Sequence, residues 1–328
     1  MNSTMRTLAC WLAPVVLAYG TAALAQDKAP GYPVRPIRII ISVSPGAGAD
    51  FVARAAAQIL SDRWGQNAVV DSRPGGGGVI AVELVGRAAP DGYTILQYGD
   101  SMLLMAAQKR LPFDVFKTFD PVVSLSTQPY ILLGHVSLPA KSIKELIALS
   151  AAKPLTYGGG AGVGATVHVG MERLAKVSGM KLKYIAYKGS SPAILALMGG
   201  ELNMATSSAM AASAAIRTGK VRGLATLGSK RIAVLPDLPS ITEQGVTGYT
   251  LTNRYNWWVP LRTPPAITAA INRVINEGMN TPQMKERLAA EGSEPPERMT
   301  PAELRKVLLR EYVDVERMVK ELNLTAPR

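Results

Sequence analysis

The stretch that decides the fold is residues 37–50, which read IRIIISVSPGAGAD. Its first half predicts a buried β-strand at 37–43, because β-branched side chains such as those of Ile and Val favour strands. Its second half is a turn of small residues, and Asp50 is well placed to cap a helix that follows it. Apolar residues then recur at helical spacing and stop near Gly65; they are Phe51, Val52, Ala55, Ala56, Ile59 and Leu60. This stretch therefore predicts a strand, a glycine turn and a helix in succession.

The same succession recurs further along the chain. A strand at 155–157, a glycine loop at 158–164 and a helix at 165–177 repeat it, and the two loops align at a constant offset of 114 residues. We interpret this as a repeated structural device, since no sequence identity over whole lobes is visible. Alternating strands and helices predict parallel sheets with helices on both faces. The other predicted strands are residues 68–70, 93–98 and 183–187, and the other predicted helices are residues 79–89, 193–198, 266–279, 282–290 and 301–322.

The N-terminal 25 residues have the pattern of an export signal. Arg6 precedes a short apolar run at 8–18, and a small-x-small triplet at 23–25 stands before Gln26, a pattern that signal peptidase accepts. A membrane anchor is disfavoured because a span needs roughly 20 apolar residues. A lipoprotein cysteine is disfavoured because no apolar region precedes Cys10. We therefore expect export by the general route, cleavage of residues 1–25, and a periplasmic location.

Length and composition limit the class of protein. The 328 residues suffice for about two domains at roughly 150 residues each. A composition of 48% hydrophobic and 18% charged residues is typical of a folded chain. The one cysteine, Cys10, lies in the segment expected to be removed, so a thiolate metal site, a thiol nucleophile and a redox pair are excluded. Because only His135 and His168 are present, a His-rich metal centre is also disfavoured, and we expect neither metal nor cofactor.

The chain is basic, with a formal net charge of +12, or +11 without Arg6. A basic protein can bind nucleic acid, but no dense Lys/Arg cluster or aromatic-basic motif is present, so nucleic acid is not an expected partner. A positive field that attracts small anions fits the charge better.

The two glycine loops predict anion binding. A helix N-terminus leaves backbone N–H groups unpaired and carries roughly half a positive charge. A glycine-rich turn lets a carboxylate or phosphate approach that backbone closely. Two such helix ends, one in each lobe, can hold a ligand from opposite sides. The positions at which a side chain would most obstruct access are Gly46, Gly48, Gly160, Gly162 and Gly164.

Other chemistries find less support. Residues 160–165 contain G-x-G-x-x-A, but a dinucleotide site needs an acidic residue roughly 20 positions later, and the next strand ends in Tyr187-Lys188-Gly189. His168 and Glu172 have a spacing that can present two metal ligands, although a plain side-chain contact is the commoner outcome. Trp257 and Trp258 are core residues or the wall of an apolar ligand site, and the core is favoured.

Taken in order, these residues resemble the Bug-type receptors, the periplasmic solute-binding proteins of tripartite tricarboxylate transporters. The resemblance runs from about Tyr32 to the C-terminus and starts with the 37–54 stretch. Its further motifs are Arg73-Pro74 with Gly75 to Gly78, Pro90-Asp91-Gly92-Tyr93-Thr94, Tyr157-Gly158 with Gly160, Gly162 and His168, Tyr187-Lys188-Gly189, Gly199-Gly200-Glu201, and Pro236-Asp237-Leu238-Pro239-Ser240 with Glu243 and Gly245.

The resemblance implies an α/β clamshell of the two-lobe, type II-like kind, in which each lobe is a mostly parallel sheet flanked by helices. We expect residues 26–122 plus 250–328 in lobe 1 and residues 123–249 in lobe 2. In such receptors a proximal loop, here 44–50, and a distal loop, here 158–166, hold a carboxylate through backbone groups and bound water. The residues expected to contact the ligand are Ser44, Gly46, Ala47, Gly48, Ala49, Asp50, Ser101, Gly160, Ala161, Gly162, Val163, Gly164, Ala165, Thr166, Ser207 and Ser208.

Departures from the family pattern bear on specificity. The family often has an acidic residue where Ser207 and Ser208 stand, and its absence disfavours an amino-acid ligand. The expected function is therefore capture of a dicarboxylate, a tricarboxylate or an aromatic acid by a non-enzymatic monomer, for delivery to the membrane subunits of a tripartite carrier. Two alternatives stay open, namely an exported α/β enzyme acting on a carboxylate or its ester, and a clamshell that signals to a membrane kinase.

Overall fold

The computed structural model describes residues 28–43, 48–75, 78–159, 163–187 and 189–324. The predicted signal peptide lies outside the described residues, and so do the centres of the two glycine loops, residues 44–47 and 160–162.

The first sheet is built around the strand predicted from the isoleucine run. Its five strands are β1 (Ile37–Ile41), β2 (Ala68–Ser72), β3 (Thr94–Gly99), β4 (Phe119–Pro129) and β10 (Thr252–Pro260). They lie in the order β2-β1-β3-β10-β4. β1 pairs in parallel with β2 and β3, while β10 runs antiparallel to both β3 and β4. Four strands thus point one way and β10 points the other.

The second sheet repeats this arrangement. Its strands are β5 (Ile131–His135), β6 (Leu155–Gly158), β7 (Leu182–Tyr184), β8 (Met204–Ser207) and β9 (Val221–Thr226). The order is β7-β6-β8-β5-β9, and β5 is the strand that runs antiparallel to its neighbours. β6 therefore occupies the place of β1, and each of these strands leads into a glycine loop. The repetition predicted from the sequence is therefore present in the strand order of the two sheets.

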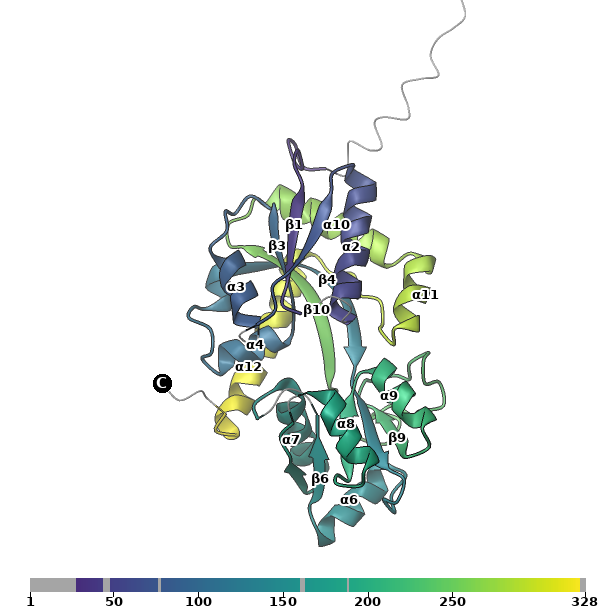
Figure 1. Ribbon diagram of the computed structural model, residues 1–328. Coiled ribbons are helices and arrows are strands. Elements are labelled where there is room, and N and C mark those ends of the chain that lie inside the picture. Colours follow the sequence, from purple (N-terminus) through teal and green to yellow (C-terminus); the bar gives the residue numbers. More distant parts are fainter. Residues whose placement is uncertain (1–27, 44–47, 76–77, 160–162, 188, 325–328) are drawn as a thin grey trace, which may run out of the picture.

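Helices cover both faces of each sheet, as Figure 1 shows for the two lobes. In the first lobe they are α2 (Gly48–Trp64), α3 (Val79–Gly86), α4 (Ser101–Ala107), α5 (Val115–Thr118), α10 (Pro265–Met279), α11 (Pro282–Ala290) and α12 (Pro301–Glu321). In the second they are α6 (Ile143–Ala152), α7 (Thr166–Ser178), α8 (Ser190–Met198) and α9 (Ala209–Arg217). The predicted α/β fold with helix-flanked sheets is confirmed.

The alternation of side chains along β1 explains why its isoleucines are buried. Ile37, Ile39 and Ile41 pack into the core formed with α2 and α10, whereas Ile40 packs on the opposite face with α3, α4 and α12. Successive side chains of a strand point to opposite faces, so a strand covered on both sides needs apolar residues at nearly every position. Arg38 interrupts the run and pairs with Asp71 on β2.

The chain crosses between the sheets at two adjacent places. β4 pairs with β10 along its whole length, so the chain leaves the first sheet at Tyr130. The Tyr130 N–H donates to the Leu251 carbonyl (3.1 Å), which joins the outgoing and returning segments. The predicted crossing at 249/250 lies between β9 and β10, whereas the one at 122/123 falls inside β4. We place the first crossing at Tyr130, because pairing with β10 holds residues 123–129 in the first sheet. The assignment of the two sheets to two lobes, with their boundaries, remains a prediction.

The two tryptophans of β10 are core residues, as favoured from the sequence. Trp257 and Trp258 are 0% and 1% exposed and face opposite sides of the sheet. The Trp257 Nε1–H donates to Gln97 Oε1 (3.1 Å). The Trp258 Nε1 is buried without a hydrogen-bond partner within the part of the chain that the structure describes.

Because the Trp257 N–H has a hydrogen-bond partner and the Trp258 N–H has none among the described residues, replacing each tryptophan by phenylalanine gives a matched comparison. Trp257→Phe leaves the buried Gln97 oxygen without its donor, so it should lower the free energy of unfolding by about 1–2 kcal/mol more than Trp258→Phe does. Urea denaturation of both variants measures the difference. Equal losses, or a larger loss for Trp258→Phe, would contradict the role given to this hydrogen bond.

Candidate functional site

A first cavity of about 270 Å³ lies where β1 and β3 end, beside the start of α2. Ligands of open α/β sheets bind outside the carboxyl ends of the strands, so this is a favourable place for a site. Ala49, Ser101 and Asn253 are among the residues that line it. Gly78 also lines it, with φ of 98°, and a Cβ there would lie 1.8 Å from the Tyr98 hydroxyl oxygen. Only glycine allows this close approach.

Gln97 fixes the start of α2 at this cavity. Its Nε2–H donates to the Ala49 carbonyl (2.6 Å), while its Oε1 accepts from Trp257. Asp50 lies in the first turn of α2, because the helix already begins at Gly48. The expectation that Asp50 is the cap is therefore wrong; its carboxylate is buried and forms an ion pair with Arg54 (2.9 Å).

A second cavity of about 420 Å³ joins the lobes and adjoins the first, since Tyr98 and Ser101 line both. From the first lobe it is lined also by Gln108 and Arg110, and from the second by the start of α7 and the start of α8. We call the two cavities together the cleft. No carboxylate side chain lines the cleft among the residues described.

Two helix N-termini of the second lobe meet at the cleft. α7 begins after Ala165 and α8 begins after Gly189, and within the described part of the chain neither N-cap residue makes a side-chain hydrogen bond to the first turn. Thr166 and Ser190, the first helical residues, both line the cleft. The N–H groups of a first helical turn have no intrahelical partner. An anion in the cleft can therefore satisfy them.

The described parts of the distal loop are held by hydrogen bonds to the body of the second lobe. The Tyr184 hydroxyl donates to the Gly159 carbonyl (3.0 Å), and the Gly164 N–H donates to His168 Nδ1 (3.0 Å). The Gly164 carbonyl accepts from Gln108 Nε2 (2.6 Å), which joins the lobes. Gly164 thus lines the cleft while its own polar groups hold the loop in place.

Gly159 directly follows β6 and has a backbone conformation that favours glycine. Its φ is 146°, and a Cβ there would lie 2.9 Å from the Thr206 carbonyl oxygen. Any larger residue would have to displace backbone.

His168 supports the described part of this loop. Its ring stacks on Tyr184 (4.3 Å between centroids), and its Nε2 lies 4.0 Å from Glu172 Oε1. Glu172 in turn accepts a hydrogen bond from the Tyr157 hydroxyl (3.0 Å). Burial lowers the pKa of His168, with Glu172 opposing this, so the neutral ring with an accepting Nδ1 is favoured. The described residues hold no group of three or more potential ligands for a metal ion.

The structure places the predicted contact residues in three groups. Those that line the cleft are Ala49, Ser101, Val163, Gly164, Ala165 and Thr166. Gly48 and Asp50 lie in the first turn of α2. Ser207 and Ser208 do not line the cleft: Ser207 is fully buried, and Ser208 caps α9 by accepting from the Ala211 N–H (3.5 Å). Outside the described residues lie Ser44, Gly46, Ala47, Gly160, Ala161 and Gly162.

Several cleft residues were not predicted from the sequence. They are Gln97, Tyr98, Gln108, Arg110, Gly189 and Ser190. Gly189 and Ser190 carried a signal, because the 188–192 stretch is a third glycine-containing turn before a helix. Gln97, Gln108 and Arg110 carried none, since their place in the cleft depends on how β3 and α4 pack.

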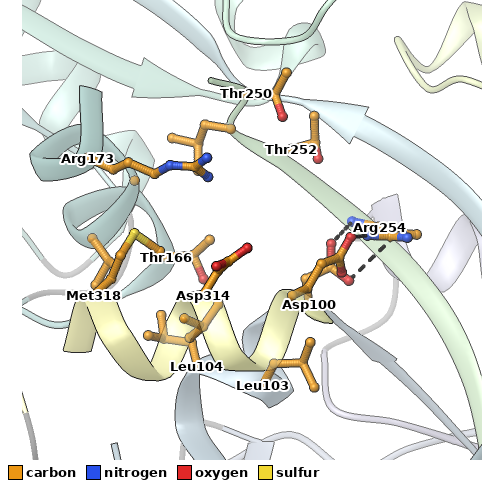
Figure 2. Close-up of a pocket in the computed structure, with 15 residues that line it drawn as sticks. Asp100, Leu103, Leu104, Thr166, Arg173, Thr250, Thr252, Arg254, Asp314 and Met318 are labelled. Carbon is orange, nitrogen blue, oxygen red and sulfur yellow. Dashed lines mark hydrogen bonds and ion pairs between the residues drawn. The ribbon is translucent and has the colours of Figure 1, made fainter. Parts of the chain in front are cut away.

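A third cavity of about 190 Å³ lies between α4, α7, α12 and β10 (Figure 2), and it shares Leu104 and Thr166 with the second cavity. Arg254 pairs there with Glu311 (2.5 Å) and Asp100 (3.7 Å). Arg173 donates to the Gly248 carbonyl (3.1 Å). Burial raises the pKa of Asp100 to about 6, while the Arg254 charge opposes the shift. These charges already have partners within the protein, which favours a structural role.

Comparisons with known proteins decide the family. The family model described as "Tripartite tricarboxylate transporter family receptor" matches residues 52–324. The chain belongs to this receptor family. Protein BugT of Bordetella pertussis is 32% identical over 290 residues, which cover 87% of this chain and 89% of BugT. A UPF0065 protein of Cupriavidus necator is 33% identical over 287 residues, with 87% of each chain covered.

Solved structures agree with the family and with the fold. A Rhodopseudomonas palustris protein solved with adipate has a TM-score of 0.74 at 27% identity, covering 88% of this chain and 97% of that one. MatC of Rhodopseudomonas palustris, solved with malate, has a TM-score of 0.71 at 26% identity, covering 88% and 100%. Periplasmic binding protein BugD has a TM-score of 0.70 at 27% identity, covering 90% and 99%. The resemblance to Bug-type receptors is confirmed. As regards membranes, none of the helices in the described part of this receptor combines the length and apolarity that a span requires.

The His168 support generates a prediction. His168→Gln removes the acceptor at the Nδ1 position and should lower the free energy of unfolding by about 1 kcal/mol. His168→Asn keeps an acceptor near that position and should lose clearly less. Thermal or urea denaturation at pH 8 measures both, and an equal loss in the two variants would contradict the role given to Nδ1.

The titration of His168 predicts how the free energy of unfolding depends on pH. Because the folded-state pKa of His168 is lowered, the unfolded chain binds the proton more readily. The free energy of unfolding should therefore fall as the pH drops below the ordinary histidine pKa of roughly 6.5. His168→Asn, which does not titrate, should lack that part of the loss. Identical pH profiles in the two proteins would contradict it.

Proposed function

We propose that this receptor binds a small carboxylate between its lobes in the periplasm and presents it to the membrane subunits of a tripartite tricarboxylate transporter. The observation that carries the proposal is the meeting of the uncapped N-termini of α7 and α8 at the cleft. A carboxylate offers several lone pairs to such N–H groups and gains from the positive end of each helix.

The relatives support this chemistry. One structural relative was solved with adipate and another with malate, and both share the fold over most of their length. Adipate and malate are dicarboxylates, although of different length and polarity. A dicarboxylate, a tricarboxylate and an aromatic acid are the ligand classes that we propose for this chain.

The mechanism that we propose is closure of the lobes on the ligand. A ligand shifts a conformational equilibrium only by its difference in affinity for the two states. One set of contacts comes from α7 and α8 of the second lobe, and another comes from the cavity wall at Ala49 and Ser101 of the first lobe. A carboxylate can make both sets of contacts only when the lobes approach each other. We propose that the membrane subunits recognise the closed form.

An enzymatic role has less support than a receptor role. A hydrolase would need a nucleophile and a base in the cleft. His135 ends β5 and contacts Ser137 (2.7 Å between Nδ1 and Oγ), and His168 is occupied by the Gly164 N–H. Neither histidine lines the cleft as described. We therefore propose a receptor without catalysis, exported with residues 1–25 removed and acting as a monomer. A sensor that uses the same site remains the second candidate.

A ligand panel tests the proposal. The protein is unfolded and refolded to remove bound metabolites, then melted in the presence of di-, tri- and aromatic carboxylates and of amines and neutral sugars. A carboxylate at about 100 times its Kd adds roughly 2.7 kcal/mol and should raise the Tm, while the amines and sugars should not. A panel in which no carboxylate raises the Tm would contradict the proposal.

A further inference from the structure

We propose that Arg110 is a specificity-determining residue of the cleft that pairs with a second anionic group of the ligand. The receptor should then prefer dicarboxylates to monocarboxylates of the same chain length. This inference rests on the proposed carboxylate-binding function and narrows it to a ligand class.

The backbone aims Arg110 at the cleft through the end of α4. The Lys109 N–H donates to the Ala106 carbonyl (3.0 Å), and the Arg110 N–H donates to the Met105 carbonyl (3.0 Å). This is the hydrogen-bond pattern of a Schellman motif, whose turn residue adopts a left-handed conformation. Lys109 is that residue, with φ of 59° although it is not glycine. The motif fixes where Arg110 leaves the helix.

The neighbouring residue ties this turn to the other lobe. Gln108 is 2% exposed, and its Nε2–H donates to the Gly164 carbonyl on the distal loop. Arg110 is two residues further along and lines the same cavity as Gly164, Thr166 and Ser190. Arg110 and two helix N-termini therefore line one cavity.

Arg110 is the one charged side chain that lines the cleft among the described residues. It forms no ion pair within the part of the chain that the structure describes, and its side chain is exposed. Burial raises the pKa of the Tyr98 hydroxyl, while a hydrogen bond with Ser42 and the nearby Arg110 charge act to lower it. Among the described residues, the cleft thus presents one positive charge without an ion-pair partner and no carboxylate.

The third cavity, drawn in Figure 2, shows how charges that have partners are arranged in the same molecule. There Arg254 is paired with Glu311 and Asp100, and Arg173 with a backbone carbonyl. Among the described residues Arg110 has no such partner, so we expect its charge to be available to a ligand.

The helix N-termini and Arg110 are proposed to bind different carboxylates of the same ligand, because these groups differ in chemistry. One carboxylate of the ligand occupies the helix N-termini, which need no side-chain cation. The second carboxylate lies near Arg110, whose planar guanidinium can donate two parallel hydrogen bonds to it. A ligand amine would meet the same positive charge and no acceptor carboxylate, so amino acids should bind less tightly than the corresponding diacids.

The test compares diacids with monoacids of equal length on matched variants. Isothermal titration at low salt uses three pairs, succinate and butyrate, glutarate and pentanoate, and adipate and hexanoate, together with citrate, terephthalate and benzoate. The wild-type protein should bind at least one diacid more tightly than its monoacid. Arg110→Gln should weaken that diacid about tenfold and leave the monoacid nearly unchanged, since a hydrogen bond to a charged group is worth roughly 1.5 kcal/mol or more. Arg110→Lys should restore part of the loss.

The control is Arg87→Gln, which removes one positive charge from the C-cap of α3, outside the cleft, where Arg87 pairs with Glu83 (3.1 Å). It should leave the preference for diacids intact. If Arg110→Gln weakens a diacid and its monoacid equally, or weakens neither, the inference about Arg110 is overturned while the receptor function stands. If the wild-type protein binds no carboxylate of the set, the proposed function itself fails.

Discussion

The proposed binding site depends on the first turn of α7, which lines the cleft and has no side-chain cap from its N-cap residue among the described residues. The loop before it must then be held by other bonds. His168 accepts from the Gly164 N–H, and Gln108 donates to the Gly164 carbonyl, so Gly164 is held without using the N–H groups that follow Ala165. Binding groups that are held in place before a ligand arrives cost less free energy to order.

The two lobes share one sheet topology. In each sheet the strand in second place leads into a glycine loop and a helix, and the strand in fourth place runs antiparallel. On the side of the first lobe, Gln97 holds the start of α2 against Trp257, as His168 holds the loop before α7 in the second. The lobes also touch outside the cleft, where Lys176 of α7 pairs with Glu321 of α12 (2.6 Å). Figure 1 shows α12 reaching from the upper lobe toward the lower one.

The sequence predicted what local patterns determine. The isoleucine run and the helical spacing after it located β1 and α2, and the predicted α11 coincides with the observed helix. Residues that reach the cleft only through tertiary packing were missed, as with Gln108 and Arg110 at the end of α4. Ser207 and Ser208 were placed in the site by resemblance alone, whereas burial and helix capping account for them here.

Backbone amide chemical-shift mapping tests the central claim most directly. It uses the carboxylate that raises the Tm most, added to saturation. The account predicts that the amides of Thr166 and Val167 in α7, of Ser190 in α8 and of Ala49 in α2 shift together with one binding isotherm. Shifts confined to one lobe, or centred on Arg173 and Asp314 in the cavity of Figure 2, would contradict it.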